Sequence, residues 1–301
     1  MSATAELVRA AFERPDSFYA RRLERAGVAP DRADDAWDRI PATRRDELVA
    51  DQLAHLPHGS RRRADAEPPI RAGATGSGAD LLVLTWTRRD LARERAAGVR
   101  TLRGLGIEPG MRVANALPGA LTTPGSLLFG DVVDDLGALD VPLGAVRDAA
   151  AAAAAWKLID RVEANVIVVD AAAAEPLFAA YPGGDRPWWR GVVSLVESAP
   201  PVPLPDDLGF RGWQRFWLAI PEAASFLAGS CGAGSLHFDS DAYVELHDLE
   251  AGRPVDRGTP GRIVVTPYAR DQILLRYVSD VKAREVDCAC GQPGWAAKLS
   301  V

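Results

Sequence analysis

The feature that most constrains the fold is an alternation of short apolar segments with helical segments in the first two thirds of the chain. The apolar segments are residues 81–87, 112–117, 138–142, 165–170 and 191–196. The helical patterns between them are residues 88–105, 126–136 and 149–159. Strands that alternate with helices predict βαβ units, in which consecutive strands are parallel. The sequence therefore predicts an α/β body with a parallel sheet.

The two ends of the chain have different patterns from this body. Residues 1–60 carry helical periodicity, and residues 58–69 have the composition of an exposed connection. Residues 242–247 and 262–266 alternate and flank a turn rich in glycine and proline, which predicts an antiparallel pair. Because His247 alternates with its neighbours on this strand, we expect its side chain on the outward face. The overall prediction is a helical segment at 1–60, an α/β body at 71–220 and a β-rich lobe at 225–295.

Composition excludes several classes of function. The 301 residues are 48% hydrophobic and 25% charged, which is typical of a globular protein. A net charge of −6 and a sequence pI of about 5.4 exclude a broad basic field for nucleic acid or an anionic membrane. No apolar run reaches the roughly 20 residues of a membrane span, and the N-terminus lacks the pattern of a secretory signal. We therefore expect a cytoplasmic protein with neither a nucleic-acid partner nor a membrane anchor.

All three cysteines lie in the last part of the sequence, in two short-range pairs of metal-ligand residues. Cys231 is followed by His237, and Cys288 by Cys290. Three thiolates and an imidazole form one of the ligand sets of a closed, tetrahedral zinc site. A metal that joined the two pairs would also close a long loop. The alternative is three buried cysteines and a surface histidine, but glycine-rich and polar surroundings favour structural zinc.

The glycine-rich stretch at residues 72–78 suggests a phosphate-binding loop. Its spacing also matches a dinucleotide fingerprint, which requires a strand before it and a helix after it. Here two prolines precede the stretch and a strand-like segment follows it, so the context excludes that fingerprint. A phosphate cradle between strands and a flexible surface loop both remain open. The cradle would consist of Gly73, Thr75, Gly76, Ser77 and Gly78.

Segments along the whole chain resemble the phenylacetate–coenzyme A ligase branch of the adenylate-forming enzymes. The segments that carry the resemblance are residues 18–28, 40–48, 86–91, 106–142, 235–237, 245–248, 261–266, 275–277 and 288–291. The resemblance implies that residues 1–301 form one large N-terminal adenylation domain. In that α/β fold, mixed and parallel sheets are flanked by helices, and the domain ends in a β-rich lobe. Members of this branch often carry zinc on a matching set of three cysteines and one histidine.

The resemblance also implies an activity and a set of site residues. In this family, ATP and a carboxylic acid, often an aryl acid, give an acyl-adenylate and pyrophosphate. A thiol such as coenzyme A then accepts the acyl group. The phosphate loop corresponds to residues 73–78, and the acidic residue near magnesium corresponds to Glu222. The adenine-side segment begins at Glu197, and the arginine–tyrosine motif supplies Arg276 and the ribose-binding Asp280.

The sequence departs from the family at several of these motifs. No lysine follows the phosphate loop, and Leu218-Ala219 stand where the family has a tyrosine–glycine pair. Asp280 comes one position early after its arginine–tyrosine pair. Relatives continue past the position of Val301 into a small C-terminal domain with a catalytic lysine, so we expect that domain to be absent. A separate small-domain, carrier or partner protein would then have to supply its role.

Three functions remain open at this point. The first is a ligase that activates a small carboxylic acid with ATP and magnesium, with impaired or partner-dependent activity. The second is a catalytically degenerate relative that acts as a binding or scaffold protein. The third is an ATP-independent transferase or condensing enzyme on the same fold. The sequence does not specify the acid, because its pocket would lie in the divergent residues 115–125 and 190–220, and it is compatible with a homodimer.

Overall fold

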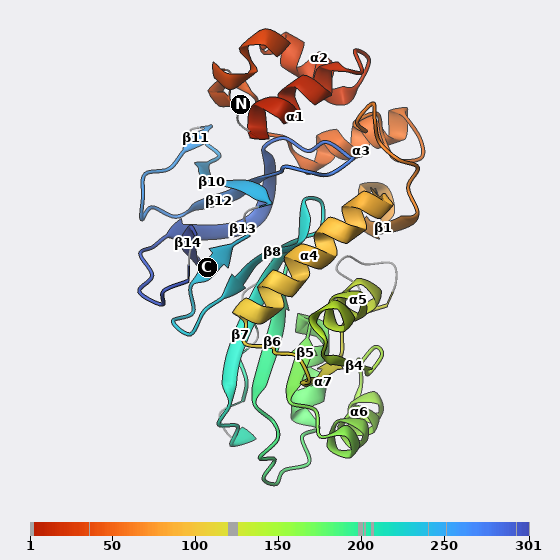
Figure 1. The fold of residues 1–301 in the computed structure, drawn as a ribbon, viewed down its shortest axis with the longest axis vertical. Coiled ribbons are helices and arrows are strands. Elements are labelled where there is room, and N and C mark those ends of the chain that lie inside the picture. The colour runs from red at the N-terminus through yellow and green to blue at the C-terminus, as the bar shows by residue number, and fades with distance from the viewer. Residues whose placement is uncertain are drawn as a thin grey trace.

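The computed structural model describes most of the chain. The described residues are 3–35, 37–119, 126–197, 201, 203–205, 208–239, 241–250, 252–292 and 294–300. The helices are α1 (Ala3–Phe12), α2 (Phe18–Arg25), α3 (Arg45–Ala54), α4 (Arg88–Gly104), α5 (Ser126–Leu136), α6 (Ala149–Val162) and α7 (Ala171–Ala179), with 3₁₀ turns at η1 (Pro30–Asp35), η2 (Trp37–Arg39) and η3 (Gly78–Asp80). In the elongated molecule, the N-terminal helices lie at one end and α6 lies near the other (Figure 1).

The strands are divided between a small hairpin and one large sheet. The strands are β1 (Arg71–Thr75), β2 (Leu82–Trp86), β3 (Arg112–Asn115), β4 (Leu139–Pro142), β5 (Val166–Val169), β6 (Gly191–Val196), β7 (Trp213–Ile220), β8 (Ala224–Ser230), β9 (Leu236–Phe238), β10 (Ala242–Asp248), β11 (Arg253–Pro254), β12 (Gly261–Pro267), β13 (Tyr277–Glu285) and β14 (Ala296–Leu299). Within the described part of the chain, twelve strands form a sheet in the order β11-β10-β12-β13-β14-β9-β8-β7-β6-β5-β3-β4. Strands β1 and β2 pair separately as an antiparallel hairpin.

The large sheet has a parallel half and an antiparallel half. Strands β4, β3, β5, β6 and β7 pair in parallel, as the alternation of strands and helices predicted. From β7 through β8 to β11, each pairing is antiparallel, including the predicted pair of β10 with β12. The structure therefore confirms an α/β body joined to a β-rich lobe.

Helices cover both faces of the parallel half. Successive residues of a strand point to opposite faces, so both faces of a buried strand must be apolar. On β5, Val166 and Val168 pack in the core that contains α4 and α5. Ile167 and Val169 pack in the core that contains α6 and α7. This double coverage explains the unbroken apolar sequence of β5.

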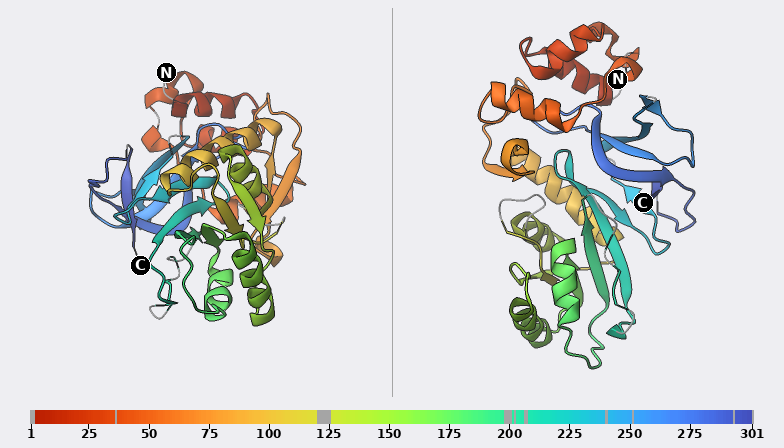
Figure 2. Two further views of the ribbon diagram at one scale, coloured as in Figure 1. Left: turned by 60° about the horizontal axis from the view of Figure 1, so that its bottom comes forward. Right: turned by 180° about the vertical axis from the view of Figure 1, so that it is seen from behind.

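The N-terminal helices pack on the C-terminal part of the chain. Leu7 and Leu23 share a core with Ile273 and Leu275, which lie between β12 and β13. Figure 2 shows these helices seated above the C-terminal strands. The hydroxyl of Thr43 donates a hydrogen bond of 2.7 Å to the carbonyl oxygen of Leu275. These contacts fix the start of α3 relative to β13.

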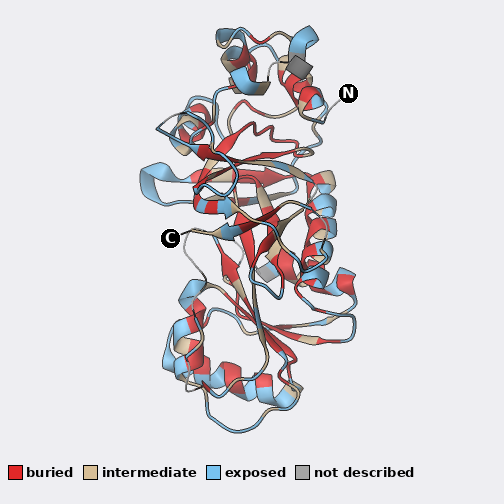
Figure 3. Ribbon diagram, turned by 90° about the vertical axis from the view of Figure 1, so that its left-hand side faces the viewer, coloured by how far each residue is buried: buried red, intermediate tan, exposed pale blue. Residues whose placement is uncertain are grey.

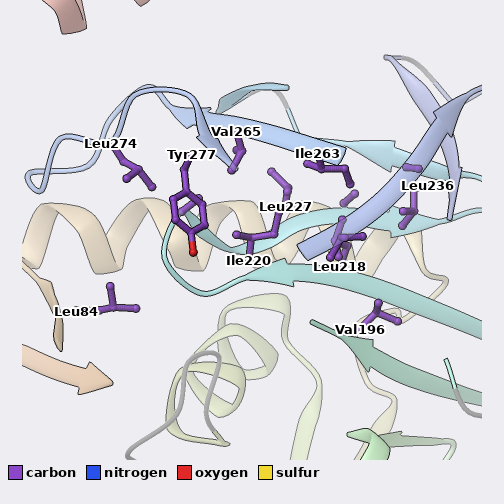
Figure 4. Packing of buried hydrophobic residues seen from close by; sticks show 14 of the residues in the cluster. Leu84, Val196, Leu218, Ile220, Leu227, Leu236, Ile263, Val265, Leu274 and Tyr277 are labelled. Atoms are coloured by element: carbon purple, nitrogen blue, oxygen red, sulfur yellow. The ribbon is translucent and has the colours of Figure 1, made fainter. Parts of the chain in front are cut away.

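The β-rich lobe and the hairpin share a core beside α4. Leu84 of β2, Leu227 of β8, Val265 of β12 and Tyr277 of β13 belong to one buried cluster. Figure 4 shows their side chains converging between the strands, and Figure 3 shows that buried residues follow the strands through the middle of the molecule. No helix within the described ranges is long and apolar enough to span a membrane.

The expected outward orientation of His247 is wrong. His247 is buried, with 3% of its surface exposed, and its Nε2 lies 3.1 Å from Arg276 Nη2 and 3.2 Å from Glu245 Oε1. Arg276 Nη1 also donates to the carbonyl oxygens of Trp37 and Ile40 at 3.2 and 2.7 Å. The N-terminal segment therefore covers the face of β10 that alternation alone would leave to solvent.

Candidate functional site

A pocket of about 460 Å³ lies at the carboxyl ends of the parallel strands β6 and β7. In open α/β sheets, ligands bind at the carboxyl ends of the strands, because loops and helix ends meet there. The residues of this pocket that bear on its chemistry are Arg45, Thr75, Glu197, Glu222, Tyr277 and Asp280. They come from α3, the hairpin, the end of β6, the turn after β7, and β13.

Glu222 projects from the tight turn that joins β7 to β8. The turn is closed by a hydrogen bond of 2.7 Å from the N–H of Ala223 to the carbonyl oxygen of Ile220. Arg270 Nη1 donates to the carbonyl oxygens of Glu222 and Ala223 at 2.9 and 3.3 Å. Glu222 is 7% exposed. The hydrogen bond within the turn and the guanidinium of Arg270 therefore both fix the backbone that carries the Glu222 carboxylate.

Arg45 supplies the positive charge that faces Glu222. Its Nη1 forms an ion pair with Glu222 Oε1 and donates to Thr75 Oγ1 at 2.8 Å. Thr75 in turn donates to Glu222 Oε1 at 2.8 Å. Arg45 Nη2 donates to the carbonyl oxygen of Asp80, across the loop that follows β1. A guanidinium from α3 therefore lies beside the glycine-rich loop, where the sequence has no lysine.

The loop after β1 requires glycine at position 76. Gly76 has a φ of +75°, and an added Cβ would lie 2.4 Å from Arg45 Nη2 and 2.5 Å from the carbonyl oxygen of Asp80. A side chain here would be strained by the backbone and would collide with the arginine. The close approach of loop and guanidinium is thus a physical reason for this glycine.

Two further acidic groups give the pocket its electrostatic character. Loss of hydration, together with the negative charges of Asp170 and Glu222, raises the pKa of Glu197 to about 7. Asp280 is exposed and forms an ion pair of 2.7 Å with Arg262. Burial and the charge of Glu222 raise the pKa of Tyr277, so its hydroxyl stays neutral. The pocket therefore combines one guanidinium with three carboxyl groups.

Some residues expected at this site lie elsewhere. Gly73 and Thr75 belong to β1 and not to a loop, and Gly73 pairs with Leu84 of β2. Neither Gly73 nor Ser77 and Gly78 lines the pocket. Arg276 is also absent from its wall, because its guanidinium is buried against Glu245 and His247. Of the adenine-side segment, only Glu197 falls within the described residues. The expected acid pocket also includes undescribed residues.

The four predicted metal ligands lie together. The ligand atoms of Cys231, His237, Cys288 and Cys290 are all within 4.8 Å of one another, the one group of this kind in the described chain. Cys231 Sγ is 3.6 Å from Cys288 Sγ, and Cys290 Sγ is 3.1 Å from His237 Nε2. Tetrahedral zinc with Zn–S bonds of about 2.3 Å separates its sulfurs by about 3.8 Å, close to the observed spacing. The donor set and its spacing fit zinc.

The thiol chemistry of this cluster also suits a metal. The backbone N–H of Cys290 and the neighbouring thiol and imidazole groups lower the pKa of the Cys288 thiol to about 6. Thiolates are the form of cysteine that binds metal. Cys231 is held at the end of β8, where its N–H donates to the carbonyl oxygen of Ser235 at 2.9 Å. The cluster joins the turn after β8 to the turn before β14.

Solved structures with this architecture include acyl-CoA and aryl-CoA ligases. An open form of 2-hydroxyisobutyryl-CoA ligase, in complex with its acyl-AMP and CoA, superposes with a TM-score of 0.84 at 21% identity over 99% of this chain and 66% of that one. A benzoate CoA ligase from Burkholderia xenovorans LB400 gives 0.52 at 15% identity over 82% of this chain and 52% of that one. A long-chain-fatty-acid-CoA ligase from Archaeoglobus fulgidus gives 0.57 at 12% identity over 78% and 51%.

These similarities establish the class of fold. The chain has the fold of the large N-terminal domain of adenylate-forming ligases, as the sequence resemblance implied. It spans about two thirds of the length of the 2-hydroxyisobutyryl-CoA ligase. No family model and no curated protein sequence matches the chain.

Proposed function

We propose that this chain binds ATP in the pocket at the ends of β6 and β7 and activates a carboxylic acid for transfer to a thiol. The observation that carries this proposal is the convergence of Thr75, Glu197, Glu222 and Asp280 on one pocket. These residues are far apart in sequence, and the resemblance to adenylate-forming ligases assigned each of them to the nucleotide. The fold shared with a ligase that was solved in complex with its acyl-AMP and CoA supports the same assignment.

Each residue of the pocket has a distinct role in this proposal. Thr75 and the backbone N–H groups of the loop face the phosphates, and the Arg45 guanidinium compensates for the missing lysine. Glu222 holds magnesium, Glu197 borders the adenine, and Asp280 accepts hydrogen bonds from the ribose hydroxyls. For the Arg45 guanidinium to contact the phosphates, its ion pair with Glu222 has to break.

The reaction then follows from these contacts. A carboxylate oxygen of the acid attacks the α-phosphorus of ATP, and the bond to the pyrophosphate oxygen breaks. Positive charge from Arg45 stabilises the negative charge that develops on the leaving group. A thiolate, such as that of coenzyme A, next attacks the acyl carbon, and AMP leaves. A small catalytic domain or a carrier protein is the partner that we propose for this second step.

The same proposal includes a structural zinc ion. Cys231, His237, Cys288 and Cys290 would hold it, and the metal would supply a cross-link between the turns after β8 and before β14. The cluster shares no residue with the wall of the nucleotide pocket. Its expected effect is therefore on stability and not on chemistry.

ATP–pyrophosphate exchange across a panel of aryl and aliphatic acids tests the proposal. Exchange above background with at least one acid is expected, along with nucleotide binding that Asp280→Ala weakens. Asp287→Ala is the matched control, because Asp287 is exposed and pairs with Arg257 away from the pocket. Failure to bind ATP with magnesium at millimolar concentration would refute the nucleotide site.

A second candidate function is a binding protein without catalysis. The Arg45–Glu222 ion pair favours it, because the arginine occupies the carboxylate that magnesium would need. This candidate predicts a folded protein that binds an acid or a partner but gives no exchange with any acid. Arg45→Ala separates the two candidates. It weakens ATP binding if Arg45 faces the phosphates, and it strengthens magnesium binding if Arg45 only blocks Glu222.

A further inference from the structure

Strand β13 departs from regular pairing where it borders the proposed nucleotide pocket. Arg262 of β12 pairs with Lys282, and two residues further along β12, Val264 pairs with Val278. Between these pairs β12 has one residue, whereas β13 has three, residues 279–281. The extra residues form a β-bulge in β13. Bulges are frequent next to active sites, because they change the direction in which a side chain points.

The bulge explains why Ser279 and Asp280 both line the pocket. Successive side chains of a regular strand point to opposite faces. Tyr277 also lines the pocket, so a regular strand would place Ser279 on the pocket face and direct Asp280 to the opposite face. The extra residues break this alternation and bring Asp280 to the pocket wall. An aspartate that comes one position early in the sequence therefore still reaches the pocket.

Hydrogen bonds from two side chains hold the bulge in place. The hydroxyl of Ser279 donates to the carbonyl oxygen of Ile263 at 2.9 Å and accepts the N–H of Val281 at 3.3 Å. Nη1 of Arg262 donates to the carbonyl oxygen of Ser279 at 3.3 Å and to Asp280 Oδ1 at 2.7 Å. Ser279 therefore bonds backbone groups where the ladder is interrupted, and Arg262 bonds both the backbone and the carboxylate of the bulge.

The Asp280 carboxylate depends on Arg262 for its orientation. The Asp280 side chain is 86% exposed, so packing does little to fix it. Within the described ranges, Arg262 is the cation paired with Asp280 through Oδ1, and Oδ2 has no hydrogen-bond partner. An ion pair this exposed contributes little to the free energy of unfolding. Its consequence is geometric, because a carboxylate held at one oxygen presents the other oxygen in a fixed direction.

We propose that Arg262 is a positioning residue, which acts through Asp280 and directs its free carboxylate oxygen at the ribose hydroxyls of the nucleotide. This inference rests on the proposed function, in which Asp280 accepts hydrogen bonds from those hydroxyls. Such bonds weaken steeply when donor and acceptor are misaligned. Arg262 itself does not belong to the described wall of the pocket. Its loss should therefore change the selectivity for the sugar and leave the contacts to base and phosphates in place.

Calorimetric titration of the full chain with ATP and with 2′,3′-dideoxy-ATP, in the presence of magnesium, tests this role. The unaltered protein should prefer ATP by about tenfold or more, which is the typical contribution of a hydrogen bond to a charged group. Arg262→Gln should lower this preference by at least about threefold, with little change in Tm. Arg257→Gln is the matched control, because Arg257 pairs with Glu285 and Asp287 outside the pocket. Its preference for ATP should equal that of the unaltered protein.

A double variant shows whether Arg262 acts through Asp280. In an Asp280→Ala background, Arg262→Gln should not change the preference further, because the carboxylate that Arg262 orients is already gone. An Arg262→Gln protein that keeps the full preference for ATP would overturn the positioning role and leave the proposed nucleotide site intact. An unaltered protein that binds both nucleotides equally would overturn the contact of Asp280 with the ribose, and the role of Arg262 with it. An unaltered protein that binds neither nucleotide would refute the nucleotide site as a whole.

Discussion

The hydroxyl of Thr75 donates a hydrogen bond of 2.8 Å to Glu222 Oε1, and this contact ties the β1–β2 hairpin to the turn between β7 and β8. Arg45 contacts both residues, since its Nη1 donates to the same hydroxyl and forms an ion pair with the same carboxylate oxygen. The three side chains therefore form one unit. A ligand that recruits any of them must rearrange the other two.

Removal of Arg45 should destabilise the protein through Glu222. Arg45→Ala leaves the mostly buried Glu222 carboxylate without its cation. We expect this change to lower the free energy of unfolding by about 2 kcal/mol, which is less than for a fully buried pair because Arg45 is partly solvated. Urea unfolding measures the change. In a Glu222→Gln background the cost of Arg45→Ala should shrink, because the charge to be compensated is gone. An equal cost in both backgrounds would show that the two residues are not coupled.

Metal removal should destabilise the β-rich lobe. We expect one zinc ion per chain by elemental analysis and a lower Tm after treatment with a strong chelator, because the metal would join the turn after β8 to the turn before β14. Cys288→Ser and Cys290→Ser should each lose zinc. His55→Ser is the matched control, since His55 lies on the far N-terminal part of the chain, at the end of α3. Full zinc content in the cysteine variants would contradict the assigned ligands.

The parts of the structure that the sequence predicted best are those with local signals. The parallel strands follow from apolar runs such as residues 166–169, and the clustering of Cys231, His237, Cys288 and Cys290 follows from two short-range pairs. Each of these patterns is complete within a few residues. Of the pocket residues, Thr75 also lies in the local glycine-rich stretch, whereas Glu222 and Asp280 were indicated by family resemblance and not by any local pattern.

The parts that the sequence did not predict depend on contacts between distant segments. Nothing near Arg45 indicates that α3 will point its guanidinium at Glu222, because that meeting depends on how the N-terminal helices dock. The outward orientation expected for His247 is wrong for the same reason, because a distant segment of the chain covers that face of β10. Alternation separates the faces of a strand, but it does not say which other segment covers each face.

The pH dependence of the site should follow Glu197. Its pKa is raised to about 7 in the folded protein, from an unfolded value near 4.5. The folded state therefore binds more protons across this window, so this group lowers the free energy of unfolding as pH rises from about 4.5 to about 7. An anionic nucleotide should also bind more weakly once Glu197 is charged.

Fluorescence titration with ATP at several pH values between 5 and 8 measures this effect. We expect affinity to decrease with rising pH in the unaltered protein and to vary much less in Glu197→Gln. Glu250→Gln is a suitable control, because Glu250 lies in the turn after β10 and outside the pocket. A pH profile that is the same in Glu197→Gln and the unaltered protein would assign the titration to another group.

Arg276 should act as a structural residue and not as a nucleotide contact. Arg276 has a φ of +47°, which is unfavourable for a residue with a side chain. Hydrogen bonds from its guanidinium to Glu245, His247 and two N-terminal carbonyl oxygens hold it in this conformation. Arg276→Gln leaves Glu245 buried without a cation, so we expect a loss of about 3–5 kcal/mol in the free energy of unfolding. The ion pairs of Arg257 with Glu285 and Asp287 are exposed, so Arg257→Gln should lower the free energy of unfolding by at most about 1 kcal/mol. Denaturant unfolding of both variants provides the comparison. If Arg276→Gln has unchanged stability but no longer binds ATP, Arg276 contacts the nucleotide after all.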